Sequence, residues 1–355
     1  MGTRGIVLLA GAVFGLLGAL LVTWGNPGNM GYCAACFLRD VAGALSIHNT
    51  ATLQYLRPEI MGFVLGAFLI ALPSGEFRAR GGSMPIIRFT LGALMMIGAL
   101  VFLGCPLRGI LRLGGGDFNA ITGLAGFACG VGIGTYFLRN GFNLGRSAIL
   151  SNPVGGYLMP VLAAILMVFV VIKPAFISFS AKGPGAVHAA VWVSLAAGLI
   201  GGVLAQRARL CLSGGVRDFI LVKDTTLLSA YGMILLVSFV ANMALGQVHW
   251  GFVGQPLAHN MHVWNFLGLF LCGLAAVLAG GCPLRQLILA GEGSLDGVMT
   301  VFGMLAGAGI AHRFLLASTP AGATPAGQIA TVVGIGIACV IGFVFREKIS
   351  LAKGV

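Results

Sequence analysis

The chain has 355 residues, of which 8% are charged and 58% are hydrophobic, and its formal net charge is +12. Because soluble proteins carry about 25% charged residues, this composition excludes a water-soluble enzyme, a nucleic-acid binder and a disordered linker. A polytopic membrane protein acquires such a positive charge from its basic cytoplasmic loops, so the charge does not require a nucleic-acid partner.

Apolar stretches recur along the chain, and a stretch of about 20 residues is long enough to cross a hydrocarbon core of about 30 Å as a helix. In chain order they cover residues 5–24, 59–73, 88–104, 118–138, 156–178, 186–205, 227–246, 263–281, 296–316 and 327–345. We therefore predict an all-α polytopic integral membrane protein with about nine or ten transmembrane helices. Residues 5–24 lack a small-residue cleavage site, so we expect a first span rather than a removed signal peptide.

Basic residues are distributed unevenly between the two sides of the predicted membrane domain. If the N-terminus lies inside, the inner segments hold Arg4, Arg78, Arg80, Arg88, Arg139, Arg146, Arg207, Arg209, Arg217, Lys223, Arg285, Arg346, Lys348 and Lys353. The outer segments hold Arg39, Arg57, Arg108, Arg112, Lys173, Lys182 and Arg313. Since basic residues concentrate in cytoplasmic loops, we expect both termini in the cytoplasm and the chain among the lipids of the inner (cytoplasmic) membrane.

The pentapeptide Gly-Cys-Pro-Leu-Arg occurs at residues 104–108 and again at 281–285, 177 positions later. Five predicted spans separate the two copies, and an odd number of crossings turns the second copy upside down. We therefore predict two inverted-topology repeats, residues 1–178 and 179–355, within a single membrane domain. Many secondary transporters use this arrangement and place the substrate near the midplane between the repeats.

In each copy the cysteine stands directly before a proline, which is preferred at the first position of a helix. A helix from Pro106 to about Leu113 would end at three glycines and would be only about 12 Å long. This length predicts a re-entrant half-helix that points its N-terminus into the membrane. Pro283 to about Ala290 predicts a second half-helix from the opposite face.

The N-terminus of a helix favours an anion and also favours the thiolate form of a cysteine. Cys105 and Cys282 would stand at these positions, and Arg108 and Arg285 would lie one helical turn further along. An arginine within the membrane is costly and usually functional or paired. We therefore expect a site for an anion, for a soft sulfur-like atom, or for both.

A second element recurs around Cys33 and Cys211, each followed six positions later by an Arg-Asp pair. These pairs are Arg39-Asp40 and Arg217-Asp218. The duplication next to arginine places both cysteines on the expected substrate path. Neighbouring side chains on a helix point in different directions, so we expect Asp40 and Asp218 to pair with charges or helix caps elsewhere.

Cys33 and Cys36 together are compatible with a redox motif, a disulfide or half of a metal site. Gly214 replaces Cys36 in the second copy and further clustered ligands are missing, so we expect neither a metal nor a cofactor. All nine acidic residues fall in loops or at the ends of predicted spans, which predicts no buried carboxylate relay for protons.

Glycine pairs spaced four positions apart predict close helix packing rather than phosphate binding. They are Gly11/Gly15, Gly62/Gly66, Gly126/Gly130, Gly198/Gly202 and Gly303/Gly307.

The duplicated GCPLR motif, Cys33 with its Arg-Asp pair and the two repeated halves resemble the YeeE/YedE family of sulfur-compound transporters. The MGYCAACFLRD stretch is most similar to the YedE branch, whose members are proposed to import selenium compounds. The thiosulfate branch uses cysteines near a constriction that contact the ion in turn. The resemblance implies that Cys33, Cys105, Cys211 and Cys282 are relay thiols with Arg108 and Arg285 as electropositive neighbours.

We therefore expect import of a small selenium- or sulfur-containing anion, with selenium preferred and thiosulfate uptake as the alternative. The ion would enter near Arg39 and Arg108, meet the thiols through weak S–H hydrogen bonds, and leave near Arg217 and Arg285. A cytosolic TusA-like sulfur or selenium carrier would trap it. A membrane sulfur or selenium transferase, a redox enzyme acting at Cys33 and Cys36, and a structural subunit remain open alternatives.

Overall fold

The computed structural model describes residues 3–346 and is almost entirely helical. Its helices are α1 (Thr3–Thr23), α2 (Ala34–Ala44), α3 (Pro58–Ala71), α4 (Pro85–Phe102), α5 (Pro106–Gly114), α6 (Asn119–Arg139), α7 (Leu158–Ile172), α8 (Val191–Arg207), α9 (Leu212–Val222), α10 (Thr226–Ala244), α11 (His262–Ala279), α12 (Pro283–Gly291), α13 (Leu295–Arg313) and α14 (Pro325–Val344). A 3-10 helix, Pro153–Tyr157, precedes α7, and the short strands β1 (Arg80–Gly81) and β2 (Ala148–Ile149) pair antiparallel. Lys348 and Lys353 lie outside the described residues.

Within residues 3–346, nine helical stretches are long and apolar enough to cross a membrane. This finding confirms the predicted all-α polytopic membrane protein and the lower of the two predicted span counts. The prediction was wrong for residues 59–73, because α3 has only 14 residues. At 1.5 Å per residue α3 is about 21 Å long and falls short of the hydrocarbon core of about 30 Å.

Three of the nine stretches are broken near their middle: Pro85–Gly114, Val191–Val222 and His262–Gly291. Each therefore consists of a longer helix followed by a half-helix. Leu103 and Gly280 stand at two of the breaks with φ of 63° and 86°, a left-handed backbone that a helix cannot continue through. The half-helices α5, α9 and α12 thus begin inside the bundle rather than at its surface.

The predicted glycine pairs lie where helices touch. A methyl group added at Gly11 or Gly15 would come within 2.4 and 2.7 Å of carbonyl oxygens of Ala230 and Ile234 on α10. The remaining pairs make equivalent contacts, α3 with α8, α6 with α11 and α13 with α4. The predicted packing role of these glycines is therefore confirmed.

The helix bounds repeat at the spacing of the sequence motif. α11 begins and ends 177 residues after α4, α12 does so after α5, and α9 lies 178 residues after α2. The contacts repeat as well, because α6 packs on α11 as α13 packs on α4, and α1 packs on α10 as α8 packs on α3. α7 and α14 depart from the pattern, since α7 packs on α3 whereas α14 packs on α4 and α11.

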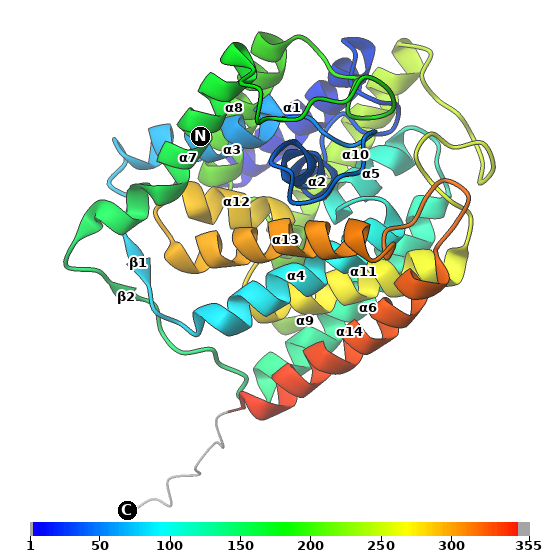
Figure 1. The fold of residues 1–355 in the computed structure, drawn as a ribbon. Helices are drawn as coiled ribbons and strands as arrows, with labels where there is room; N and C mark the ends of the chain where they lie inside the picture. Colours follow the sequence, from blue (N-terminus) through cyan, green and yellow to red (C-terminus); the bar gives the residue numbers. More distant parts are fainter. Residues whose placement is uncertain (1–2, 347–355) are drawn as a thin grey trace, which may run out of the picture.

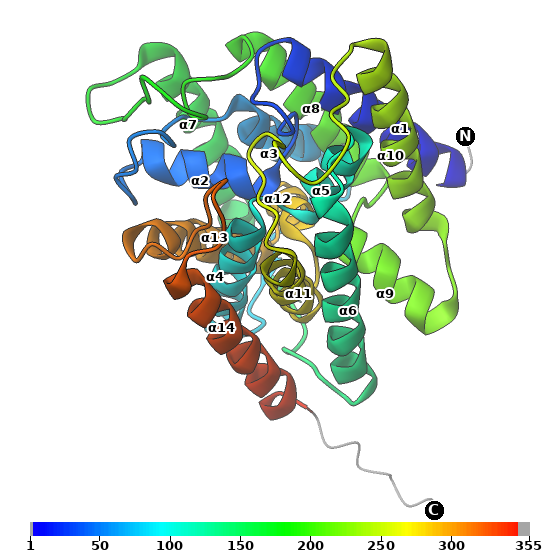
Figure 2. The same cartoon turned by 90° about the vertical axis from the view of Figure 1, so that its right-hand side faces the viewer.

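α4 and α11 lie beside each other in the middle of the molecule (Figure 1 and Figure 2). In both views α1, α3, α8 and α10 lie on one side of this pair, and α14 lies on the other. The two backbones touch at Gly98 and Gly268, where an added methyl group would come within 2.4 and 2.8 Å of the opposite glycine's carbonyl oxygen. The half-helices α5 and α12 continue from the ends of this central pair.

Five arginines that the loop count treats as surface charges are buried in the bundle: Arg39, Arg57, Arg108, Arg112 and Arg285. The count by loops assigned Arg108 and Arg285 to connecting segments although the predicted half-helices carry them, and it did not foresee that Arg39, Arg57 and Arg112 are buried as well. Without these residues the outer basic side chains reduce to Lys173, Lys182 and Arg313. The excess of basic residues on the inner side, which predicts cytoplasmic termini, therefore becomes larger relative to the outer side.

Candidate functional site

The half-helices α5 and α12 begin where the sequence predicts, at the proline that follows each duplicated cysteine. Cys105 and Cys282 have extended backbones just before them and are almost fully buried. Their side chains accept no hydrogen bond from the first turn, so both thiols are available for other contacts. The predicted cap position is confirmed, but the thiol itself does not act as the cap.

Cys33 and Cys211 do act as caps, for α2 and α9. The Cys33 Sγ accepts a hydrogen bond from the backbone N–H of Cys36 at 3.2 Å, and the Cys211 Sγ accepts one from Gly214 at 3.3 Å. The sequence analysis did not predict these helix starts, because helix caps are usually Ser, Thr, Asp or Asn. Cys36 and Gly214 are equivalent in this contact, since each supplies a backbone N–H to the capping thiol.

The four duplicated cysteines form two pairs with the same geometry. The backbone N–H of Cys105 donates to the Cys33 Sγ at 3.5 Å, and that of Cys282 donates to the Cys211 Sγ at 3.5 Å. Each pair therefore brings together the N-termini of two half-helices, α2 with α5 and α9 with α12. A helix N-terminus carries partial positive charge, so the electrostatic character of each pair favours an anion over a cation.

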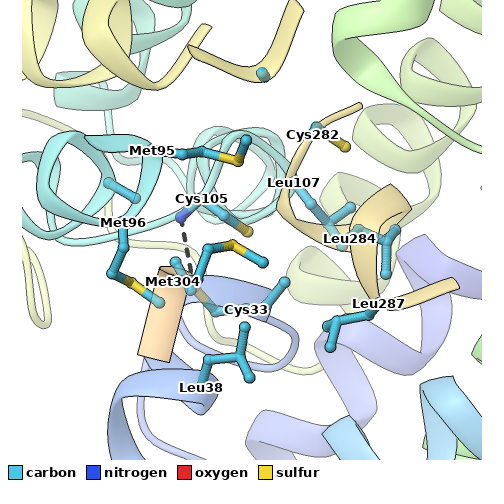
Figure 3. Packing of buried hydrophobic residues seen from close by; sticks show 14 of the residues in the cluster. Cys33, Leu38, Met95, Met96, Cys105, Leu107, Cys282, Leu284, Leu287 and Met304 are labelled. Atoms are coloured by element: carbon cyan, nitrogen blue, oxygen red, sulfur yellow. Dashed lines mark hydrogen bonds between the residues drawn. The ribbon is translucent and has the colours of Figure 1, made fainter. Parts of the chain in front are cut away.

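Three methionines belong to the same buried cluster as the first pair. Met95 and Met96 from α4 and Met304 from α13 are fully buried in one cluster with Cys33 and Cys105, shown in Figure 3. A thioether is soft and polarizable, so the surroundings suit a sulfur-containing ion. Methionines are ordinary core residues, and for this reason their place in the sequence gave no signal.

Tyr231 is a further residue that the sequence analysis missed. It lies on α10, its side chain is buried, and its hydroxyl has no hydrogen-bond partner within the described residues. Cys105, Cys211 and Cys282 all lie within electrostatic range of it. A buried hydroxyl without a partner is unfavourable, and an anion held between the cysteine pairs would supply the missing acceptor.

Arg108 is buried, and its hydrogen bonds include one to Cys36, in the first turn of α2. Its Nη1 donates to the Cys36 Sγ at 3.2 Å, and its Nε donates to the carbonyl oxygen of Asn29 at 2.7 Å. Further donations go to the carbonyl oxygens of Leu103 and Leu257. Within residues 3–346 it has no acidic partner, unlike the other four buried arginines. The Arg108 charge is therefore uncompensated.

The Arg-Asp pairs correct the sequence prediction. Arg39 bonds its own neighbour Asp40 at 2.7 Å, and Arg217 bonds Asp218 at 2.8 Å. The expectation that neighbouring side chains point apart was wrong, because the long arginine side chain folds back onto the aspartate. Asp40 also has the expected distant partner, since Arg57 reaches it at 2.8 Å.

Arg285 differs from Arg108, its counterpart in the first GCPLR motif. Arg285 makes a two-atom contact with Glu292 at 3.0 and 3.4 Å. Gly115, at the position equivalent to Glu292, offers no carboxylate to Arg108. The surroundings of the first motif are therefore the more electropositive, because no carboxylate neutralises Arg108 as Glu292 neutralises Arg285.

One cavity lies beside Arg108, and another is lined by Cys211. The first, which we call the Arg108 cavity, has a volume of about 390 Å³ and is lined by Arg39, Arg108 and Leu257 among others. The second, the Cys211 cavity, has a volume of about 250 Å³ and is lined by Cys211, Arg217, Asp218, Arg285 and the end of α11. Leu257 precedes the start of α11, so the cavities lie at opposite ends of this helix of 18 residues, which is about 27 Å long.

Parts of this chain are similar to known sulfur-transport proteins. A family described as Sulphur transport matches residues 207–351, which include α9, α11, α12 and their duplicated cysteines. The thiosulfate transporter TsuA of Spirochaeta thermophila is 35% identical over 104 residues, which are 29% of this chain and 31% of that protein. The thiosulfate transporter TsuA of Escherichia coli is 32% identical over 108 residues, 30% of each chain.

The resemblance to the YeeE/YedE family is thereby confirmed, through a match that lies in the second half of the chain. The chain spans about a third of the length of the two relatives, so their activity transfers to it only as a proposal. Both relatives are named for thiosulfate. The expected preference for selenium receives no support, and the thiosulfate alternative is the better supported of the two.

Proposed function

We propose, from the sulphur transport pattern in its second half, that this membrane protein carries a small sulfur-containing anion of the thiosulfate type across the inner membrane. The observation that carries the proposal is the pair of matched cysteine contacts, Cys33 with Cys105 and Cys211 with Cys282, each at two converging helix N-termini. Two such anion-stabilising points in series, with a cavity beyond each, suit the passage of an ion rather than its storage.

The proposed route begins in the Arg108 cavity and ends in the Cys211 cavity. The uncompensated Arg108 draws the anion in, and the thiols of the two pairs pass it on through weak S–H hydrogen bonds. The Tyr231 hydroxyl donates to it between the pairs. Because the second cavity's Arg217 and Arg285 already have acidic partners, attraction weakens along the route, which favours release.

Two repeats of opposite orientation, residues 1–178 and 179–355, would explain why each contact occurs twice. The repeated helix bounds and the exchanged helix contacts support this organisation. Under it, the Arg108 cavity opens outward, the Cys211 cavity opens to the cytoplasm, and both termini are cytoplasmic. The strengthened bias of the exposed basic residues supports the same orientation.

Import of a dianion must be driven. Moving two negative charges inward against 100 mV costs about 4.6 kcal/mol, at about 2.3 kcal/mol per charge. Capture by a cytosolic carrier of the TusA type would remove the ion after release. In this scheme any sulfur chemistry takes place on the carrier, and the membrane protein acts as a transporter rather than as an enzyme.

Uptake of radiolabelled thiosulfate into proteoliposomes tests the proposal. We expect Cys105→Ala and Cys282→Ala each to reduce uptake about tenfold or more, because a hydrogen bond to a charged group is worth about 1.5 to 3 kcal/mol. The matched control is Cys129→Ala, which removes an exposed thiol and should leave uptake unchanged.

Competition by unlabelled selenite and sulfite in the same assay ranks the substrates, and thiosulfate should compete most strongly. If both cysteine variants take up thiosulfate at the wild-type level, the result would contradict the relay of the ion between thiols. Chemical turnover of thiosulfate by detergent-solubilised protein, with no second compartment, would instead favour the transferase or redox alternative.

A further inference from the structure

The acidic residues of the bundle divide by whether a basic side chain neutralises them. Of the eight that the structure describes, six form ion pairs: Asp40, Glu76, Asp117, Asp218, Glu292 and Asp296. Asp224 has no such partner and is exposed to solvent. Glu59 has none either, yet its side chain is completely buried. Among the carboxylates that the structure describes, Glu59 alone has neither a basic partner nor exposure to solvent.

The sequence analysis placed every acidic residue in a loop or at the end of a span, and the structure buries Glu59 instead. Glu59 stands at the start of a predicted span, as the sequence analysis had it, but α3 is short and its first turn lies inside the bundle. An ionised carboxylate in such a place is strongly unfavourable without a counter-charge. A bound proton or a bound cation would supply the charge compensation that the surroundings lack.

The hydrogen bonds around Glu59 distinguish these two ligands. Its Oε1 accepts from the Asn26 Nδ2 and from the Ser194 Oγ, both at 2.9 Å, whereas its Oε2 has no partner. The orientation of the Asn26 amide is fixed, because its Oδ1 accepts from the N–H of Ala189 and its Nδ2 also donates to the carbonyl oxygen of Gly31. Donors, not oxygen ligands, thus face the carboxyl group, and this suits a proton rather than a metal cation.

The titratable groups around Glu59 do not neutralise it. Tyr32 and Tyr55 lie within electrostatic range, and His188 stacks on Tyr55 with ring centroids 4.0 Å apart. Arg57, two positions away, is engaged by Asp40 at 2.8 Å and by the carbonyl oxygen of Pro184 at 2.7 Å. The Tyr55 hydroxyl also has no partner within the described residues. His188, which stacks on Tyr55, is exposed.

A single loop, residues 24–33, connects Glu59 to the proposed anion path. Asn26 in this loop holds the Glu59 carboxyl group, and Asn29 accepts the hydrogen bond from Arg108. The loop then leads into Cys33, the cap of α2. Among residues 3–346, the loop therefore joins the one buried arginine that lacks an acidic partner to the one buried carboxylate that lacks a basic partner.

We propose that Glu59 binds a proton that is transported with the anion, and that the loop 24–33 couples its protonation to occupancy of the Arg108 site. This inference rests on the proposed function, because it assumes that an anion reaches Arg108. When the anion binds Arg108, the loop is held in place and Glu59 takes up its proton. One proton per dianion halves the charge that must cross the membrane against the potential.

Proteoliposomes with an acidic exterior and a trapped pH indicator test the coupling. In the wild type, thiosulfate entry should acidify the interior, and each unit of pH gradient should raise accumulation about tenfold. Glu59→Gln keeps the hydrogen-bond acceptor for Asn26 and Ser194 but cannot exchange a proton. It should remove both effects while retaining exchange of labelled for unlabelled thiosulfate at equal pH. Asp224→Asn, at an exposed acid, is the control and should behave as wild type.

A readout without transport separates the two proposals. Hydrogen/deuterium difference infrared spectra of the purified wild type should show the C=O stretch of a buried protonated carboxyl group that is missing in Glu59→Gln. A band that is equal in both proteins, or a Glu59→Gln protein that still accumulates thiosulfate in response to a pH gradient, would overturn the assignment. Dependence of accumulation on sodium rather than pH would also overturn it. Failure of the wild type to move thiosulfate, with the infrared band present, would overturn the proposed function and the coupling that rests on it, but would leave the protonated state of Glu59 established.

Discussion

Arg108 and Arg112 are separated by about one turn of α5 and are both buried, but only Arg112 has an acidic partner, Asp117 at 2.7 Å. Removing one member of a buried ion pair leaves the other charge unpaired, which costs about 3 to 5 kcal/mol. Removing an uncompensated charge leaves no charge behind. The presence or absence of a carboxylate therefore separates Arg112, whose charge is neutralised inside the bundle, from Arg108, whose charge remains free for the proposed anion.

This contrast gives a test at the residue scale. Arg112→Gln should lower thermal stability strongly, because Asp117 is left buried without its cation. Arg108→Gln should lower stability less, by about 1 to 3 kcal/mol for the carbonyl groups it leaves unsatisfied, but should reduce thiosulfate uptake by about tenfold or more. Thermal unfolding in detergent and uptake in proteoliposomes measure the two effects. Equal loss of stability in the two variants would remove the distinction.

Helix packing in the centre depends on glycine rather than on large apolar side chains. At Gly98 an added methyl group would lie 2.4 Å from the Gly268 carbonyl oxygen, whereas at Gly132 on α6 nothing lies within 4 Å. Small residues let transmembrane helices approach until their backbones touch. The positions of the cysteines thus depend on a contact that no side chain can adjust.

At the scale of the element, we expect Gly98→Ala to destabilise the bundle by about 1 to 3 kcal/mol, the usual cost of overpacking. Gly132→Ala makes the same chemical change in open space and should leave stability unchanged or slightly raised. The midpoints of thermal unfolding of the purified proteins provide the comparison. An equal midpoint for both variants would show that the central helices can separate at little cost.

The sequence was most informative where local rules decide the structure. Proline after Cys105 and the glycines after Leu113 determine α5 to within a residue, because both ends follow from backbone chemistry. The starts of α2 and α9 could not be found in this way, since a thiol is an unusual cap. The burial of Glu59 and the pairing of Arg39 with Asp40 were also out of reach, because they depend on which distant segments pack against them.

The whole molecule presents two cavities at opposite ends of α11, and two inverted halves would place those ends on opposite sides of the membrane. Thr52 lines the Arg108 cavity, and Arg207 lies two positions from Arg209, which lines the Cys211 cavity. Both residues are exposed. They are therefore suited to report the side from which each end can be reached.

In a Cys129→Ala background, we expect a membrane-impermeant maleimide to label Thr52→Cys on intact cells. Arg207→Cys should react only after the membrane is permeabilised, because the proposed orientation places it in the cytoplasm. The background protein without either new cysteine controls for labelling of the remaining native thiols. Labelling of both positions from the same side would contradict the inverted arrangement.

The backbone contact between Gly98 and Gly268 has a consequence for selectivity. The backbones of α4 and α11 touch there without side chains between them, so an ion path between the half-helices that continue from them would keep a nearly constant width. A gap of constant width works as a sieve, in which the size of an ion decides its admission before the strength of its binding does. Discrimination against bulkier oxyanions would then be a property of two glycines that never touch the ion.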